Sequence, residues 1–147
     1  MATANLQQAA EQLLSLIKRL RQLSPATPPP QAAQVSPSMM SIIDFVGLSP
    51  DCGVKEIARG LKLSTPTVSV SIRHLEEAGF IDRRPHPADR RAVQIFLTPK
   101  GRELYQQTYA FQRQTFERLL SGLTPDERQT LLELLEKAIT QTENFHT

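Results

Sequence analysis

Cysteine is nearly absent: among 147 residues there is one, Cys52. A single thiol excludes an intrachain disulfide and cannot supply the ligands of a zinc finger. A thiol-based redox sensor needs a reactive thiolate, but the neighbouring Asp51 is expected to raise the pKa of Cys52. Redox sensing through Cys52 is therefore kept only as an alternative function.

The sequence also lacks the motifs that carry catalysis. There is no Gly-rich phosphate loop and no nucleophile elbow. The three histidines, His74, His86 and His146, share no metal-ligand spacing with one another or with Cys52. These absences argue against an enzyme, and they predict neither a metal site nor a bound cofactor.

Long apolar runs are missing as well. The most apolar stretch, residues 39–48, is short and is interrupted by Ser41 and Asp44. A transmembrane helix needs about 20 predominantly apolar residues, and the first residues do not resemble a signal peptide. The sequence therefore predicts a cytoplasmic protein without a membrane partner.

Net charge is small, but its distribution is uneven. The whole chain carries a formal charge of +2, whereas residues 61–102 hold eight Lys or Arg against four acidic residues. The other 105 residues hold nine basic and eleven acidic side chains. A basic segment on a nearly neutral protein favours a nucleic-acid partner, although a solvated charged surface remains the alternative.

Hydroxyl side chains followed by proline mark expected helix starts, at Ser36, Thr65, Thr98 and Thr124. Glu127 lies three residues after Thr124 and predicts a capping box. The stretch PATPPP at residues 25–30 is expected to form a stiff linker. Helices are expected near 5–22, 37–47, 54–61, 66–78, 99–121 and 125–143. Strands are expected near 80–84 and 92–97, with a short strand near 52–54.

The helix expected at 66–78 has two different faces. Val68, Ile72 and Leu75 fall within one arc at 100° per residue and are expected to face the core. The opposite arc carries Pro66, Ser69, Val70, Arg73 and Glu77, with Thr67 and His74 at its edges. Small polar residues there allow close approach to base edges in the major groove of DNA.

Two residues of this face carry specific hypotheses. Val70 is suited to contact a thymine methyl group, and Arg73 to reach a guanine or a phosphate. The alternatives are that Val70 is a scattered surface valine and that Arg73 pairs with Glu76 or Glu77. The preceding helix and the turn at residues 62–64 have helix-turn-helix spacing.

The hairpin expected after this helix ends in a basic tip, Asp89-Arg90-Arg91. A basic loop beside a helix that reads the major groove is suited to the DNA backbone or the minor groove. An Asp next to two arginines can hold one guanidinium group through a bidentate pair. A winged helix that binds another protein is a further alternative, but it has no need of such a tip.

The outer helices, 5–22, 99–121 and 125–143, carry more apolar surface than a winged-helix core of about 65 residues can cover. They either pack on one another within one chain or cover a second copy. A two-fold dimer is favoured because it places two reading helices on one face of DNA.

Residues 63–81, LSTPTVSVSIRHLEEAGFI, and residues 89–101, DRRAVQIFLTPKG, resemble the MarR family of transcriptional regulators. The resemblance implies a mainly α fold (α+β winged helix): a winged helix-turn-helix at 36–98, flanked by dimerisation helices at 1–35 and 99–147. It implies a homodimeric repressor on a pseudo-palindromic operator in double-stranded DNA, with Arg91 in the minor groove and Asp89 orienting it. The expected DNA-binding residues are Ser64, Thr65, Pro66, Thr67, Ser69, Val70, Arg73, His74, Asp89, Arg90 and Arg91.

The resemblance also implies a small aromatic or phenolic effector in a cleft beside the winged helix. The residues expected there are Met39, Met40, Ile43, Tyr105 and Tyr109, whose alternative role is plain core packing. Two positions depart from the family pattern. Lys62 stands where the family usually has Gly and is expected to adopt a left-handed conformation, at a cost of about 1–2 kcal/mol. Val70 stands where Arg is frequent, so the operator sequence does not carry over from relatives.

Overall fold

The computed structural model describes residues 2–23, 29–89 and 91–145. The chain divides into two compact units, one made of residues 25–111 and the other of residues 1–24 and 112–147. The elements follow in the order α1 (Ala2–Gln22), η1 (Pro30–Gln34), α2 (Pro37–Leu48), α3 (Val54–Leu61), α4 (Thr65–Glu77), β1 (Ile81–Pro85), β2 (Val93–Leu97), α5 (Pro99–Leu120) and α6 (Pro125–Asn144). The expected fold class, a mainly α winged helix, is confirmed.

Most expected boundaries are met within one or two residues, and the exceptions have local causes. The 3₁₀ helix η1 was not expected. Its first residue, Pro30, is the last residue of the proline-rich stretch, and its other four residues follow that stretch. Residues 25–28 of the predicted linker lie outside the described residues. The short strand expected near 52–54 is one isolated bridge, in which the Ile95 amide donates to the Cys52 carbonyl at 2.9 Å.

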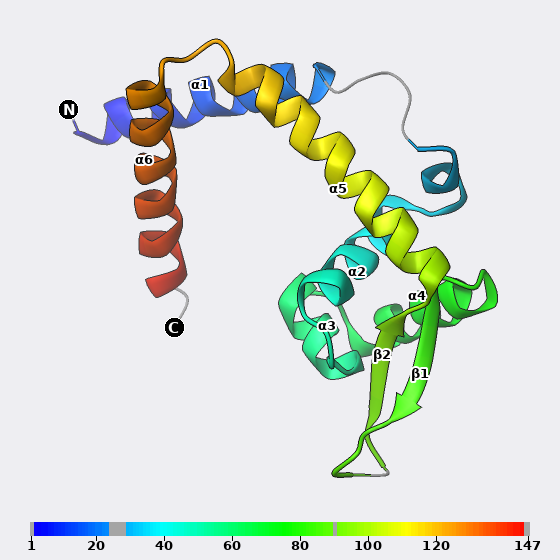
Figure 1. The fold of residues 1–147 in the computed structure, drawn as a ribbon. Helices are drawn as coiled ribbons and strands as arrows, with labels where there is room; N and C mark the ends of the chain where they lie inside the picture. The colour runs from blue at the N-terminus through cyan, green and yellow to red at the C-terminus, as the bar shows by residue number, and fades with distance from the viewer. Residues whose placement is uncertain (1, 24–28, 90, 146–147) are drawn as a thin grey trace. The chain divides into compact units, whose positions relative to one another are not determined.

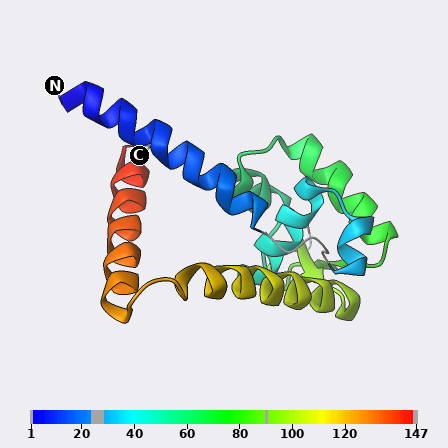
Figure 2. The same cartoon turned by 90° about the horizontal axis from the view of Figure 1, so that it is seen from above.

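The unit of residues 25–111 groups α2, α3, α4 and the start of α5 (Figures 1 and 2). Its buried side chains form one apolar core. The helices α2, α3 and α4 supply most of its side chains, and the rest come from the hairpin, the start of α5 and the connecting residues Cys52 and Phe80. Val68, Ile72 and Leu75 face this core, as the sequence predicts. The nine largest fully buried side chains are those of Phe80, Ile42, Ile43, Ile57, Ile72, Leu75, Ile95, Leu104 and Val68.

The antiparallel hairpin pairs Ile81 with Leu97 at its base and Pro85 with Val93 at its outer end. Figure 1 shows it extending away from the helices of its unit. The alternation of buried and exposed side chains that a half-buried strand would show along β2 is broken: Ile95 is buried, but Val93 is 41% exposed and Gln94 is buried. The outer end has no helix to pack against, so the alternation ends where the core ends.

The second unit consists of α1, the later turns of α5, and α6. No residue of α6 is buried, and the described side chains of α1 are all exposed except that of Leu20, which is half-buried. Large apolar side chains are therefore left in solvent, among them Leu6 (71% exposed), Leu14 (59%) and Ile139 (52%). None of the helices described is long and apolar enough to cross a membrane.

The junction of α4 with the hairpin is formed by Gly79 and Phe80. Gly79 has a φ of 82°, and the Phe80 amide donates to the Leu75 carbonyl at 2.9 Å, as in a Schellman cap. The Thr98 hydroxyl donates to the Gly79 carbonyl at 2.5 Å, and the Thr98 amide donates to the Phe80 carbonyl at 3.0 Å. The start of α5 is thereby fixed against the end of α4.

Gly101, in the first turn of α5, lies directly against this junction. A Cβ atom at position 101 would overlap the carbonyl of Phe80, which is backbone and cannot rotate away. We expect Gly101→Ala to lower the free energy of unfolding by about 1–3 kcal/mol, although alanine favours helix. Urea denaturation followed by circular dichroism measures this. Gly122→Ala is the matched control, because its Cβ meets only the Leu119 carbonyl at 3.7 Å; equal losses in both variants would contradict the expectation.

Asp44 lies half-buried on α2, and burial raises the pKa of its carboxyl above the ordinary value of 3.8. The folded state therefore favours the protonated form, and stability is lost as pH rises through the folded pKa. We expect Asp44→Asn to be more stable than the wild type at pH 7, with the difference shrinking as pH falls towards 3.8. Thermal melts at several pH values test this, and a difference independent of pH would contradict it.

Candidate nucleic-acid interface

The turn between α3 and α4 is held by its backbone. Lys62 has φ 54° and ψ 41°, which is the left-handed conformation predicted from the sequence. The Leu63 amide donates to the Ala58 carbonyl at 2.9 Å, so α3 ends in a Schellman cap with a lysine at the position that favours glycine. The cap sets the direction in which α4 leaves the turn.

The start of α4 is capped by Ser64 rather than by Thr65, which is the first residue of the helix. The Ser64 hydroxyl accepts a hydrogen bond from the Thr67 amide at 3.2 Å, and its oxygen lies 2.6 Å from the Thr67 hydroxyl oxygen. Pro66 occupies the first turn. The pair of hydroxyls therefore stands at the exposed N-terminal end of the helix.

The outer face of α4 is open, as expected. Ser69 is half-buried, and Val70 is 46% exposed. The remaining predicted DNA-contacting residues of this region, Ser64, Thr65, Pro66, Thr67, Arg73 and His74, are exposed. The predicted residues thus lie together on one continuous strip that begins at the N-cap.

Not every cation of the basic segment is available to a partner. The Arg83 Nε lies 2.9 Å from a carboxylate oxygen of Glu76, which joins β1 to the last turn of α4. Arg84 lies 3.5 Å from Asp82 and stacks on the Phe96 ring at 4.8 Å. Lys100 donates to the Ala78 carbonyl at 2.8 Å. These three cations stabilise the joints between elements.

Other cations have no carboxylate partner. Within the described ranges, Arg73, Lys62 and Arg91 make no ion pair. The pairing of Arg73 with Glu76 or Glu77, which the spacing allowed, is not observed among the described residues, and Glu76 is bound by Arg83 instead. An exposed guanidinium group without a carboxylate partner on the outer face of α4 is suited to an anionic ligand.

The tip of the hairpin is shaped by Asp89. Its carboxylate accepts a hydrogen bond from the Arg91 amide at 2.9 Å. The expected bidentate pair with the Arg91 guanidinium is absent from the described contacts, because the carboxylate is turned towards the backbone. Arg90 lies outside the described residues. Asp89 therefore holds the backbone at Arg91 and not the Arg91 side chain.

Cys52 is placed where its thiol is poorly accessible. It is 6% exposed in the core, and burial raises its pKa, with Glu56 and Asp51 acting in the same direction. A protonated, buried thiol is a weak nucleophile. This arrangement disfavours the redox-sensor alternative. Among the described residues no cluster of three or more His, Cys, Asp or Glu is placed to hold a metal ion.

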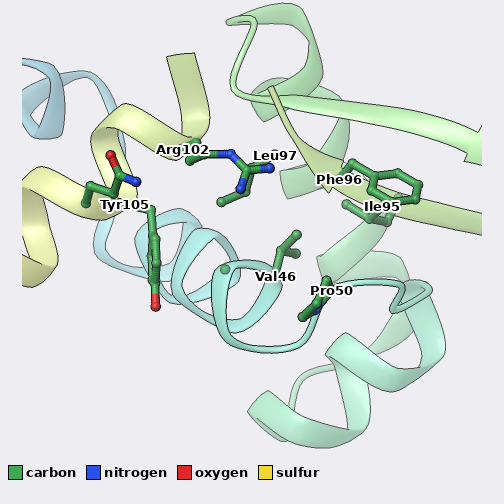
Figure 3. A pocket seen from close by; sticks show the side chains of 9 residues that line it. Val46, Pro50, Ile95, Phe96, Leu97, Arg102 and Tyr105 are labelled. Atoms are coloured by element: carbon green, nitrogen blue, oxygen red, sulfur yellow. The ribbon is translucent and has the colours of Figure 1, made fainter. Parts of the chain in front are cut away.

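The five residues expected to form an effector site are only partly brought together. Ile43 is fully buried in the core, which agrees with the packing alternative. Met39, Met40 and Tyr105 are half-buried against that core, and the Tyr105 and Tyr109 rings lie 6.3 Å apart. Of the five, only Tyr105 lines the pocket shown in Figure 3, which lies between the end of α2, β2 and the start of α5.

Sequence reasoning missed two features of this region. The Glu76–Arg83 pair was not predicted, although opposite charges on either side of the Gly79 turn are the signal for it. Arg102 on the rim of the pocket was also missed. Its signal is a basic residue in the first turn of a helix, where the helix dipole favours an acid.

The geometry described so far, a capped helix-turn-helix followed by a basic hairpin, defines a winged-helix DNA-binding protein. The sequence profile of the MarR family matches residues 35–93. The transcriptional regulator YwhA of Bacillus subtilis is 32% identical over 85% of this chain and 88% of its own length. BilQ of Clostridium symbiosum, also a helix-turn-helix regulator, is 27% identical over 73% of this chain and 74% of its own.

A solved structure is also similar to this chain. FabT of Streptococcus pneumoniae, crystallised in complex with DNA, superposes with a TM-score of 0.82 at 26% identity, over 95% of this chain and 99% of that one. The chain belongs to the MarR family. It is a DNA-binding transcriptional regulator of the helix-turn-helix type and not an enzyme.

Proposed function

We propose that this protein is a homodimeric repressor that binds a pseudo-palindromic operator in double-stranded DNA. The observation that carries the proposal is the outer face of α4, which is exposed except at the half-buried Ser69 and carries Arg73 without an acidic partner among the described residues. On this proposal α4 enters the major groove and the hairpin tip follows the backbone or the minor groove. FabT, to which this chain is similar, was crystallised in complex with DNA, which supports DNA as the partner.

Repression is inferred from the way the site would be covered. A protein that occupies both grooves excludes other proteins from the same base pairs, so bound promoter DNA is closed to polymerase. A small aromatic or phenolic effector is proposed to relieve this block, with Met39, Met40, Tyr105 and Tyr109 as its candidate contacts. Because the partner is chromosomal DNA, we place the protein in the cytoplasm.

The homodimer is inferred from the apolar side chains of α1, α5 and α6. Along α6, Leu132, Leu135 and Ile139 are each about half exposed. Because these side chains are about half exposed, leaving the row in water forgoes about half of the roughly 1.5–3 kcal/mol that full burial of a large apolar side chain provides. A second copy of the same helices would cover it, and a two-fold axis would set two α4 helices on one face of DNA.

We expect sedimentation at micromolar concentration to give about twice the chain mass of 16.5 kDa. Leu135→Glu should shift the protein towards monomer, because it places a charge in the apolar row. Thr140→Glu is the matched control, since residue 140 is exposed and lies about 140° round the helix from residue 135. A wild-type monomer, or equal effects of the two variants, would refute this interface.

The roles of Arg91 and Asp89 are tested by fluorescence anisotropy with duplexes obtained by in vitro selection. Arg91→Ala should weaken binding to operator and random duplexes alike, and it should lower the salt slope by about 0.9 for each phosphate that the variant no longer neutralises. Asp89→Ala should also weaken binding, because the Arg91 amide loses its acceptor. Asp89→Asn keeps an acceptor oxygen and should bind at least as well as the wild type.

Two variants on α4 serve as controls for the hairpin variants. Arg73→Ala and Val70→Ala should change the preference among sequences more than the affinity for random DNA. If Val70 contacts a thymine methyl, replacing that thymine with deoxyuridine should weaken the wild type but not Val70→Ala. Unchanged affinity in Arg91→Ala, or tighter binding in Asp89→Ala, would show that the hairpin tip has another role.

A further inference from the structure

The loop that joins β1 to β2, residues 86–92, stands at the outer end of the hairpin (Figure 1). Its ends are held together by the backbone: the His86 amide donates to the Ala92 carbonyl at 3.0 Å, and the Ala92 amide donates to the Asp89 carbonyl at 3.1 Å. His86 is half-buried, and the other described residues of the loop are exposed. The shape of the loop therefore depends on hydrogen bonds rather than on apolar contacts.

Two further hydrogen bonds of this loop have side-chain acceptors. The Asp89 carboxylate accepts from the Arg91 amide at 2.9 Å, and the His86 Nδ1 accepts from the Ala88 amide at 3.0 Å. A neutral imidazole has one nitrogen that accepts and one that donates, whereas both nitrogens of the protonated ring are donors. The hydrogen bond from the Ala88 amide therefore requires a neutral His86.

His86 also lines a groove of about 420 Å³ between this loop, β2 and the start of α3. The charged groups that face it there are three carboxylates and two cations, namely Asp51, Glu56 and Asp89 with Lys55 and Arg91. The groove thus holds one more negative than positive charge while His86 is neutral. A protonated ring is repelled by the Ala88 amide and attracted by the carboxylates, so it turns from the amide into the groove.

We propose that His86 is a positioning residue for the DNA contact of the hairpin, and that it holds the loop only while it is neutral. Neutral His86 fixes the Ala88 amide and keeps Asp89 and Arg91 in place. Protonation releases that amide, and the loop that carries Arg91 loses its order. Protonated His86 therefore lowers the affinity for DNA; this second step rests on the proposed function. The signal is acidification within the range of about pH 5–8, in which imidazoles ordinarily change charge.

Nuclear magnetic resonance of the full-length protein without DNA tests the first step. As the pH falls from about 8 to about 5, the Ala88 amide proton should move upfield together with the titration of the His86 ring. His86→Asn is the matched variant, because its side-chain oxygen is attached to Cγ, as Nδ1 is, and accepts a hydrogen bond without titrating. The Ala88 signal should stay in place in this variant. An Ala88 signal that ignores the His86 titration, or that moves equally in His86→Asn, would overturn the proposal.

Fluorescence anisotropy with a selected duplex tests the second step at constant ionic strength. His74 is exposed on the outer face of α4 and also titrates, so all proteins compared carry His74→Gln. At about pH 8 the protein with His86 and the His86→Asn variant should bind alike. His86→Ala has no acceptor for the Ala88 amide and should bind about two- to tenfold more weakly at any pH. At about pH 5.5 the protein with His86 should fall to the level of His86→Ala, while His86→Asn keeps its advantage.

The ratio of the affinities of His86→Asn and of the protein with His86 decides the outcome, because effects of pH on the DNA and on other groups are common to both. A ratio that does not change with pH would overturn the second step alone. Tighter binding by the protein with His86 at low pH would also overturn it, since the protonated ring would then contact a phosphate directly. Absence of duplex binding in every protein would instead contradict the proposed function, while the resonance experiment would still decide whether His86 holds the loop.

Discussion

The burial of Phe80 is the constraint on which the winged helix depends. Its ring is fully buried, its amide closes the cap of α4, and its carbonyl receives the Thr98 amide before α5 begins. The Lys100 ammonium lies over the same ring at 4.5 Å from its centroid. One side chain thus sits where α4, the hairpin and α5 meet, and none of the three can shift without disturbing the contacts of the other two.

Much of the fold follows from local sequence signals. The capping box at Thr124 and Glu127 forms as predicted, with bonds of 2.8 and 3.3 Å. The apolar face of α4 follows from spacing, and the left-handed Lys62 is the conformation that the family resemblance implies. Such features depend on residues within a few positions of one another, and the order of apolar and polar side chains records them directly.

The partners of charged side chains could not be predicted in this way. The residue pattern placed Asp89 beside two arginines, but it did not indicate that the carboxylate would accept from a backbone amide. It likewise left Glu76 free to pair with Arg73, whereas the turn at Gly79 brings Arg83 to it. Composition shows which charges are present, and only the path of the chain decides which of them neutralise one another and which remain for a ligand.

The hairpin has few buried residues, and this affects both its local stability and the free energy of DNA binding. Among its strand residues only Ile81, Gln94 and Ile95 are buried: Ile81 lies at the base, Ile95 in the middle and Gln94 one pair before the outer end. Segments with few buried contacts open locally at a small fraction of the global free energy of unfolding. Amide hydrogen exchange near Pro85 and Val93 should accordingly outpace that at Ile95. A ribbon that samples several orientations loses conformational entropy when DNA holds it still, so part of the binding energy is spent on ordering the protein itself.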